Sequence, residues 1–228
     1  MEKLIFLDTE TTGNDPKKDR LVQVSYKTDS GGMKTGYFKP PIPMSVKAMS
    51  ITHITNKMLE DKEAFKDSEM KRELRLLFTE GILVAHNALF DIAMLKNEGL
   101  EVGKFIDTLR LARHLDPENK IPEYNLQFLR YYLDLEIEAL SHDATGDVMV
   151  LEALFKRLQA KITDLDEMVE ISARPTLFKY MIFGKYKGQS IEDILKTDRR
   201  YLEWLLEQKL TNEAGEEDWI FTLKHYLE

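Results

Sequence analysis

Two acidic residues, Asp8 and Glu10, follow a short apolar run near the start of this 228-residue chain. The run Leu4–Leu7 is uniformly apolar, which is typical of a buried strand. Side chains alternate along a strand, so Asp8 and Glu10 are expected on the same face of it. Two carboxylates at the end of a buried strand repel each other and lose hydration, and a cation between them offsets both costs. The pair therefore predicts a divalent metal site.

A second group of polar residues follows a later apolar run. His86, Asn87 and Asp91 come directly after Ile82–Ala85. A junction between a strand and a helix places side chains at the carboxyl edge of a sheet, where α/β proteins bind their ligands. We expect Asp91 in the first turn of the helix. The alternative for Asp91 is a residue that only complements the helix dipole.

The third group lies at the start of a strongly amphipathic segment. His142 and Asp147 are five residues apart, so they do not share a helix face. We expect His142 on the loop, Asp143 as the helix N-cap and Asp147 in the first turn. The alternative for His142, taken alone, is a surface or capping histidine.

In this order, Asp8 with Glu10, then Asp91, then His142 with Asp147 resemble the three motifs of the DnaQ-like 3'-5' exonucleases. The subclass is the one whose third motif carries histidine. The resemblance implies a ribonuclease H-like fold and an enzyme that hydrolyses phosphodiesters from a 3' end, releasing nucleoside 5'-monophosphates. Residues 48–55 are similar to the family's connecting segment after the third strand.

The tail of the chain carries a second resemblance. Residues 174–228, with Phe183 to Gly188 and Tyr201 to Leu205 among them, are similar to the C-terminal module of the exodeoxyribonuclease X group. This similarity implies DNA as the substrate and a role in DNA repair. The expected partner is a DNA 3' end, single-stranded or in a frayed duplex.

The five motif residues have expected roles in hydrolysis. We expect Asp8, Glu10, Asp91 and Asp147 to hold two Mg²⁺ or Mn²⁺ ions, with His142 taking a proton from the attacking water. All-oxygen ligands in a chain without cysteine favour these ions over zinc. Two such ions generate a nucleophile and relieve charge on the phosphate. An unperturbed histidine titrates near ~6.5, close to the operating pH.

Six more residues are candidates for substrate contacts: Thr11, Thr12, Gly13, His86, Asn87 and Phe90. Phe90 could stack on the terminal base, or be a core residue of its helix. Gly13 would let the chain approach the terminal nucleotide closely, with backbone N–H groups contacting its sugar, or belong to an ordinary tight turn. His86 and Asn87 could bind phosphate or orient Asp91, or be a satisfied structural pair.

The elements that position these residues follow from periodicity. Strands are expected at Leu4–Leu7, Leu21–Tyr26, Gly36–Phe38, Ile82–Ala85 and Phe105–Asp107, the second and third joined as a hairpin. Helices are expected near Leu109–Ala112, Ala144–Lys161, Asp164–Ile171, Ile191–Leu195 and Tyr201–Leu206. This order predicts an α/β fold with a mixed five-stranded sheet flanked by helices. We place an exonuclease domain at residues 1–165 and a small C-terminal module at 174–228.

Composition and charge limit the alternatives. The chain is 43% hydrophobic and 32% charged, which suits a soluble globule. No apolar run approaches the ~20 residues that span a bilayer, and the first strand leaves no room for a signal peptide. We therefore expect a cytoplasmic protein without a membrane partner; the oligomeric state is open. The net charge of -8 disfavours broad electrostatic binding of nucleic acid, although the basic turn Lys185–Lys187 is a candidate contact.

Two alternatives to a DNA exonuclease remain. The same chemistry could act on RNA, because discrimination depends on how the site treats the 2'-hydroxyl. A catalytically inactive nucleic-acid-binding protein on the same fold is the other, since fold does not fix function.

Overall fold

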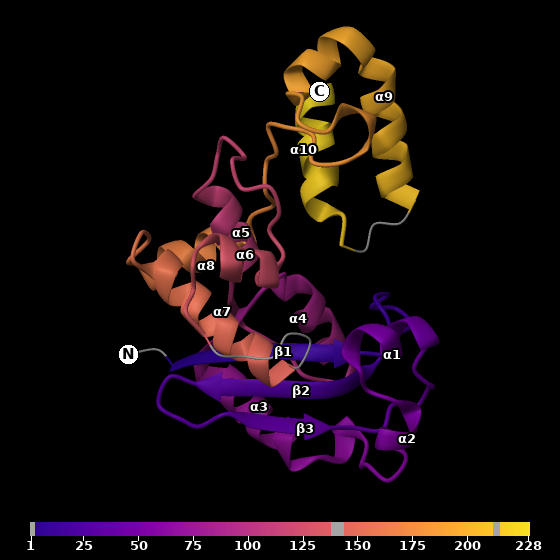
Figure 1. The fold of residues 1–228 in the computed structure, drawn as a ribbon, viewed down its shortest axis with the longest axis vertical. Coiled ribbons are helices and arrows are strands. Elements are labelled where there is room, and N and C mark those ends of the chain that lie inside the picture. The colour runs from indigo at the N-terminus through magenta and orange to yellow at the C-terminus, as the bar shows by residue number, and fades with distance from the viewer. Residues whose placement is uncertain (1–2, 138–143, 212–214) are drawn as a thin grey trace.

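A computed structural model describes residues 3–137, 144–211 and 215–228 of the chain (Figure 1). Its five-stranded sheet has the order β3-β2-β1-β4-β5. The strands are β1 (Lys3–Thr11), β2 (Leu21–Thr28), β3 (Lys34–Tyr37), β4 (Gly81–Ala85) and β5 (Lys104–Asp107). β1 pairs antiparallel with β2 and parallel with β4, so the sheet is mixed and β1 lies at its centre. The predicted fold class is therefore confirmed.

The helices of the body follow the strands in chain order. They are α1 (Val46–Thr52), α2 (Asn56–Leu59), α3 (Glu69–Glu80), α4 (Ala88–Asn97), α5 (Thr108–His114), α6 (Leu126–Tyr132), α7 (Ala144–Gln159) and α8 (Leu165–Ala173), with a 3-10 turn η1 at Phe65–Asp67. The long predicted helix thus ends two residues earlier than expected. The third strand begins at Lys34, two residues before the expected start, and ends at Tyr37.

Helices cover both faces of the sheet. Phe6 of β1 joins a core with α7, where its ring meets Phe155 edge to face at 5.4 Å. Ile5 and Leu7 point to the opposite face and join a core with α3 and α4. Alternation along β1 therefore assigns every second residue to one helical layer. Since Asp8 and Glu10 follow Phe6 in this alternation, they belong to the face that α7 covers.

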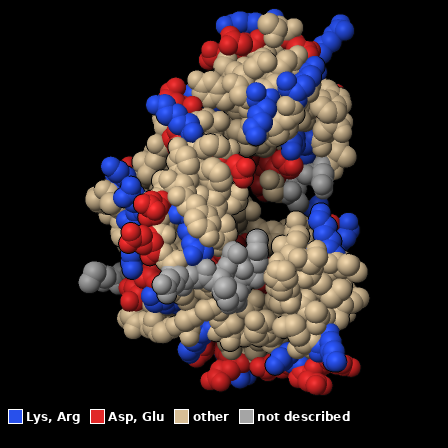
Figure 2. Space-filling model, in the orientation of Figure 1, with Lys and Arg blue, Asp and Glu red and all other residues tan. Residues whose placement is uncertain are grey.

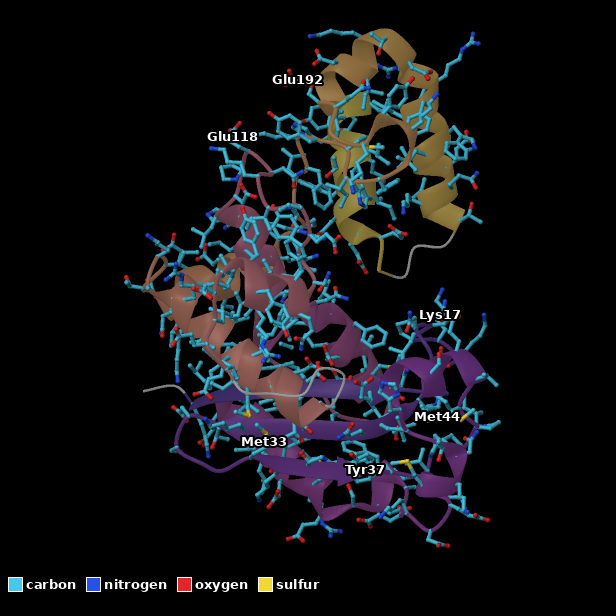
Figure 3. The ribbon with its side chains drawn as sticks, viewed as in Figure 1. Lys17, Met33, Tyr37, Met44, Glu118 and Glu192 are labelled. Atoms are coloured by element: carbon cyan, nitrogen blue, oxygen red, sulfur yellow. The ribbon has the colours of Figure 1, made fainter. Side chains whose placement is uncertain are left out.

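The connecting segment after β3 forms its own small cluster. Ser45 caps α1, because its side chain accepts a hydrogen bond from the Ala48 N–H. Met44 and Ala48 are buried in this cluster, with Tyr37 packed against it; Figure 3 labels Met44 and Tyr37 at this end of the sheet. The segment therefore packs beside the end of β1 that carries the acidic pair.

The C-terminal helices α9 (Ile191–Thr211) and α10 (Glu217–Leu227) form a separate core with the segment around the 3-10 turn η2 (Gly184–Tyr186). Figure 1 shows them in yellow and orange beyond α5. Two helices were predicted where α9 runs, and Asp198 interrupts α9 with non-helical dihedral angles, so the two predicted helices lie on either side of it. In the described ranges, no helix combines the length and the apolar character needed to cross a bilayer.

Candidate active site

Three acidic side chains from distant parts of the chain meet at the end of β1. Asp8 and Glu10 come from β1 and Asp147 from the first turn of α7. One carboxylate oxygen of each lies within 4.8 Å of the other two, and all three residues are partly buried. A register shift between Glu10 and Thr11 ends the regular pairing of β1 with β2 at this point. Bulges of this kind commonly occur next to active sites, where they redirect side chains.

The chemistry of this group suits a hard divalent cation. Three carboxylates so close together repel one another unless positive charge lies among them. Their oxygen atoms are the ligands that Mg²⁺ and Mn²⁺ prefer. Asp147 also lies at a helix N-terminus, where the dipole favours a negative side chain. The residues present therefore fit the predicted kind of metal site.

Asp91, the fourth predicted ligand, lies beside this group without belonging to it. Its Oδ1 accepts a hydrogen bond of 2.7 Å from the Thr9 hydroxyl, and the residue is only 4% exposed. Burial raises the pKa of Asp91 to about 7, while the Thr9 hydrogen bond acts in the opposite direction. Thr9 stands between Asp8 and Glu10 in sequence. Strand β1 therefore supplies two of the four predicted acidic residues, bonds to Asp91 through Thr9, and lies beside Asp147.

The predicted general base belongs to a segment that the structure does not describe. His142 and its neighbour Asp143 fall in residues 138–143, which the structure does not describe. α7 begins at Ala144, directly after this segment, and Asp147 is in its first turn as predicted.

The turn after β1 is held by its own side chains. The Thr11 hydroxyl donates to the Gly13 carbonyl oxygen at 2.6 Å, and the Thr12 hydroxyl donates to Asp19 at 2.7 Å. A Cβ atom on Gly13 would come within 2.6 Å of the Asp19 carboxylate. A larger residue at position 13 would therefore displace the Asp19 carboxylate from the turn.

The junction between β4 and α4 is likewise held from within the protein. The two ring nitrogens of His86 lie 2.9 Å from the Thr108 hydroxyl and 2.7 Å from the Tyr124 carbonyl oxygen. Burial lowers the pKa of the His86 ring to about 4. Asn87 has a left-handed backbone (φ 66°), and its N–H donates to Asp107 at 2.9 Å. Phe90 packs against the core of α3 and α4.

Sequence reasoning missed two residues near the site. Gln127 of α6 donates a hydrogen bond to Asp147, and nothing in the sequence around it indicates this contact. Asp107 caps α5 by accepting a hydrogen bond from the Leu109 N–H. Its second bond, to the Asn87 N–H, joins two elements 20 residues apart and could not be read from local sequence.

Two hollows border these residues. A cavity of about 300 Å³ opens beside the acidic group and is lined by Glu10, Thr11, Gly13, Asn14, Ser45, Lys47, Ala48, Ile51 and Thr52. A larger hollow of about 640 Å³ separates the C-terminal helices from the body. Acidic side chains border this larger hollow in Figure 2, and Glu123, Glu217 and Asp218 are among its lining residues. The smaller cavity adjoins the acidic group directly, through Glu10.

Comparison with known proteins agrees with this geometry. The sequence model of the Exonuclease family (RNase_T) matches residues 5–155, and that of the exodeoxyribonuclease X-like C-terminal domain matches residues 181–209. Exodeoxyribonuclease 10 of Escherichia coli K12 is 31% identical over 192 residues, which cover 83% of this chain and 82% of that protein. DNA polymerase III subunit epsilon of Rickettsia conorii is 32% identical over 187 residues, covering 74% and 79% of the two chains.

Solved structures give the same result. A structure of exonuclease X in complex with 5' overhanging duplex DNA superposes with a TM-score of 0.62 and 26% identity. The match covers 76% of this chain and 100% of the exonuclease X chain. The family match spans the described acidic group, the β4–α4 junction and most of α7. The chain therefore belongs to the exonuclease family and is a DnaQ-like exonuclease similar to exodeoxyribonuclease X.

Proposed function

We propose that this protein is a metal-dependent 3'-5' exodeoxyribonuclease that releases nucleoside 5'-monophosphates from DNA 3' ends. The observation that carries the proposal is the convergence of Asp8, Glu10 and Asp147, with Asp91 one hydrogen bond away through Thr9. Three carboxylates with oxygen atoms within 4.8 Å of one another repel unless positive charge lies among them, which supports a metal site. We further propose that it acts in DNA repair and in the cytoplasm.

The proposed roles follow the arrangement of the side chains. Asp8, Glu10, Asp91 and Asp147 would hold two Mg²⁺ or Mn²⁺ ions at the end of β1. Bound ions of this kind supply an activated water and relieve negative charge on the phosphate. His142 would accept a proton from the attacking water, a role that rests on the motif resemblance alone. Asp91 is protonated over part of the neutral range, so ion binding there is expected to release a proton.

The 3' nucleotide is proposed to occupy the cavity beside Glu10. Its lining joins the turn after β1 to α1, with the backbone of Gly13 available for a close approach. Lys47 is exposed at its rim and offers a positive charge to a phosphate group. Of the six predicted substrate contacts, Thr11 and Gly13 line this cavity, whereas His86 and Asn87 line the larger hollow.

The choice of DNA rests on the relatives. The Escherichia coli relative is named exodeoxyribonuclease 10, and the exonuclease X structure contains duplex DNA. These names describe those proteins, and we extend them to this chain because the family matches cover both of its parts. We therefore propose an exonuclease domain at residues 1–165 and a C-terminal module at 174–228.

End-labelled substrates test the proposal. DNA and RNA oligonucleotides of matched sequence, labelled at the 5' end, are incubated with Mg²⁺, with Mn²⁺ or with chelator. We expect a ladder of products shortened from the 3' end, formed faster on DNA and only with metal. Label placed on the 3' nucleotide should leave as a mononucleotide in the first turnover.

Four outcomes would contradict parts of the proposal, and they bear on its polarity, its substrate and its mechanism separately. Shortening from the 5' end would overturn the polarity, and equal rates on RNA would overturn the substrate. Cleavage in chelator, or full activity of Asp147→Asn, would overturn the metal-dependent mechanism. Asp61→Asn serves as the matched control, because Asp61 is an exposed carboxylate on a turn remote from the acidic group in sequence.

A further inference from the structure

Gln127 contacts one of the proposed metal ligands from outside the acidic group. Its Nε2 atom donates a hydrogen bond to Oδ1 of Asp147, and Gln127 is partly buried. The two residues come from different helices, α6 and α7, so the contact fixes one helix against the other. No part of the proposed function assigns a role to Gln127.

Arg130 determines which way the Gln127 amide faces. Nη1 of Arg130 lies 3.4 Å from Oε1 of Gln127 and donates to it. An arginine side chain has donors only, and an ionised carboxylate has acceptors only. A glutamine between them satisfies both partners only with its oxygen toward Arg130 and its nitrogen toward Asp147. The guanidinium is itself buried and also donates to the Ile137 carbonyl oxygen.

The start of α6 is held firmly enough to support this contact. Asn125 caps the helix by accepting a hydrogen bond of 2.8 Å from the Phe128 N–H. Leu129 is completely buried in the core that contains Val148 and Leu151 of α7. Capping and packing therefore place Gln127 on the first turn of α6, opposite the first turn of α7.

We infer that Gln127 is a positioning residue that holds the Asp147 carboxylate in the orientation facing Asp8 and Glu10. The inference rests on the proposed function, because it requires Asp147 to be a metal ligand. Hydrogen bonds to a ligating carboxylate fix its rotamer before the ion arrives, so less orientational freedom is lost on binding.

Replacing Gln127 with methionine tests this role. Gln127→Met keeps the length of the side chain and removes its donor. Loss of an outer partner of a metal ligand typically costs about 10–100-fold in metal affinity or activity. We expect the Mn²⁺ dissociation constant, measured by calorimetry without substrate, to rise by about 10–100-fold. Turnover should be largely restored at saturating Mn²⁺, because the ligands themselves remain.

The controls separate this inference from the proposed function. Gln208→Met places the same change on an exposed position of α9 and should leave Mn²⁺ affinity unchanged. Gln127→Asn has a side chain too short for its amide to reach Asp147, so it should weaken Mn²⁺ binding as Gln127→Met does. If Gln127→Met unfolds early in a thermal melt, the result for Gln127→Asn decides between the outcomes. Absence of Mn²⁺ binding by the unaltered protein would instead overturn the proposed function.

One result would overturn the inference while leaving the proposed function intact. If the unaltered protein binds Mn²⁺ and Asp147→Asn loses that binding, the metal site stands. Mn²⁺ dissociation constants of both Gln127 variants within twofold of that of the unaltered protein would then show that Asp147 is oriented without the hydrogen bond from Gln127. Tighter binding would show that Gln127 competes with the ion for Asp147, which also contradicts a positioning role.

Discussion

Asp91 and the three converging carboxylates occupy different electrostatic surroundings. Asp8, Glu10 and Asp147 are partly exposed to water, whereas Asp91 is buried on the first turn of α4. Burial disfavours the charged form, which is why the pKa of Asp91 rises to about 7. The Thr9 hydroxyl offsets part of that cost by donating to the carboxylate.

The proposed role of His142 as the general base can be tested by substitution. As the proposed general base, it should contribute roughly 10²–10⁴-fold to turnover. We expect His142→Ala to lose activity in that range while Mn²⁺ affinity stays unchanged. His114→Ala, at an exposed position in the last turn of α5, is the matched control. A loss below tenfold in kcat would remove His142 from this role.

His86 gives the folded protein a specific dependence on pH. Its pKa is about 4 in the folded protein, because of burial, and near ~6.5 when unfolded. Below pH 6.5 the unfolded state therefore binds the proton first, and stability falls as the pH drops from 6.5 toward 4. The stabilising contribution lost over that interval is at most roughly 3 kcal/mol.

His86→Gln should remove this dependence. We expect the difference in free energy of unfolding between the unaltered protein and the variant to shrink as the pH falls from 7 to 4.5. Urea denaturation in chelator at both values measures it, and other titrating groups cancel in the difference. A difference that stays constant, or grows, would mean that His86 titrates normally in the folded protein.

At the scale of elements, one buried carboxylate joins the starts of two helices. Oδ1 of Asp107 accepts from the N–H groups of Asn87 and Leu109, each at 2.9 Å. It therefore ties the N-terminus of α4, which carries Asp91, to the N-terminus of α5. Asn87 adopts a left-handed backbone there without a side-chain cap of its own. Such a conformation in a residue other than glycine persists only where its surroundings hold it.

Two substitutions of Asp107 separate hydrogen bonding from charge. Asp107→Ala leaves both N–H groups without their acceptor and should cost roughly 2–4 kcal/mol in the free energy of unfolding. Asp107→Asn keeps an oxygen acceptor and should cost less. Urea denaturation at pH 7 gives both values. Equal losses in the two variants would show that the charge of Asp107, and not its acceptor, holds the junction.

At the scale of the whole molecule, the C-terminal module is anchored by buried charges. Asp218 of α10 accepts from Arg110 at 2.9 Å and from Arg113 at 2.8 Å, both on α5. It also accepts from the Thr176 N–H at 2.9 Å. Arg110 is only 6% exposed and donates to the Ser172 carbonyl oxygen as well. Removing the module would leave this guanidinium without its carboxylate.

A second ion pair beside this junction is weaker. Glu118, labelled in Figure 3 on the α5–α6 connection, lies 3.6 Å from Lys179, but both side chains are more than half exposed. Pairs of that kind contribute little to stability.

Lys185, a predicted DNA contact, is bound to Asp198 at 2.9 Å and lies over the rings of Tyr186 and Tyr201. The Lys185 side chain is still more than half exposed, so a DNA contact there stays a prediction.

Asp218→Ala should uncouple the module from the body. Breaking a buried pair by removing one partner typically costs about 3–5 kcal/mol. We expect a loss of that size, since Arg110 stays buried without its partner. Urea denaturation followed by tryptophan fluorescence measures it, with Glu207→Ala as an exposed control on α9. A loss below about 1 kcal/mol would mean that water replaces the carboxylate and the junction is open.

The sequence by itself determined the strands, several of the helices and the chemistry of the acidic residues, but it did not predict α6, which carries Gln127, or α10, which carries Asp218. Apolar runs and alternation identified the five strands of the sheet, because both patterns depend only on residues within the strand itself. Local periodicity also placed Asp8 and Glu10 on one face of β1, and Asp147 on the first turn of α7. The motif order then identified the family that the comparisons confirm.

Only the tertiary structure decided which side chains meet. Gln127 reaches Asp147, Thr9 reaches Asp91, and Asp218 reaches Arg110 across separations of 20, 82 and 108 residues. Spacing in the sequence fixes a side chain's direction on its own element, whereas the distance between two elements depends on how their buried faces pack. Contacts between elements therefore could not be derived from local patterns, although the residues that make them were visible.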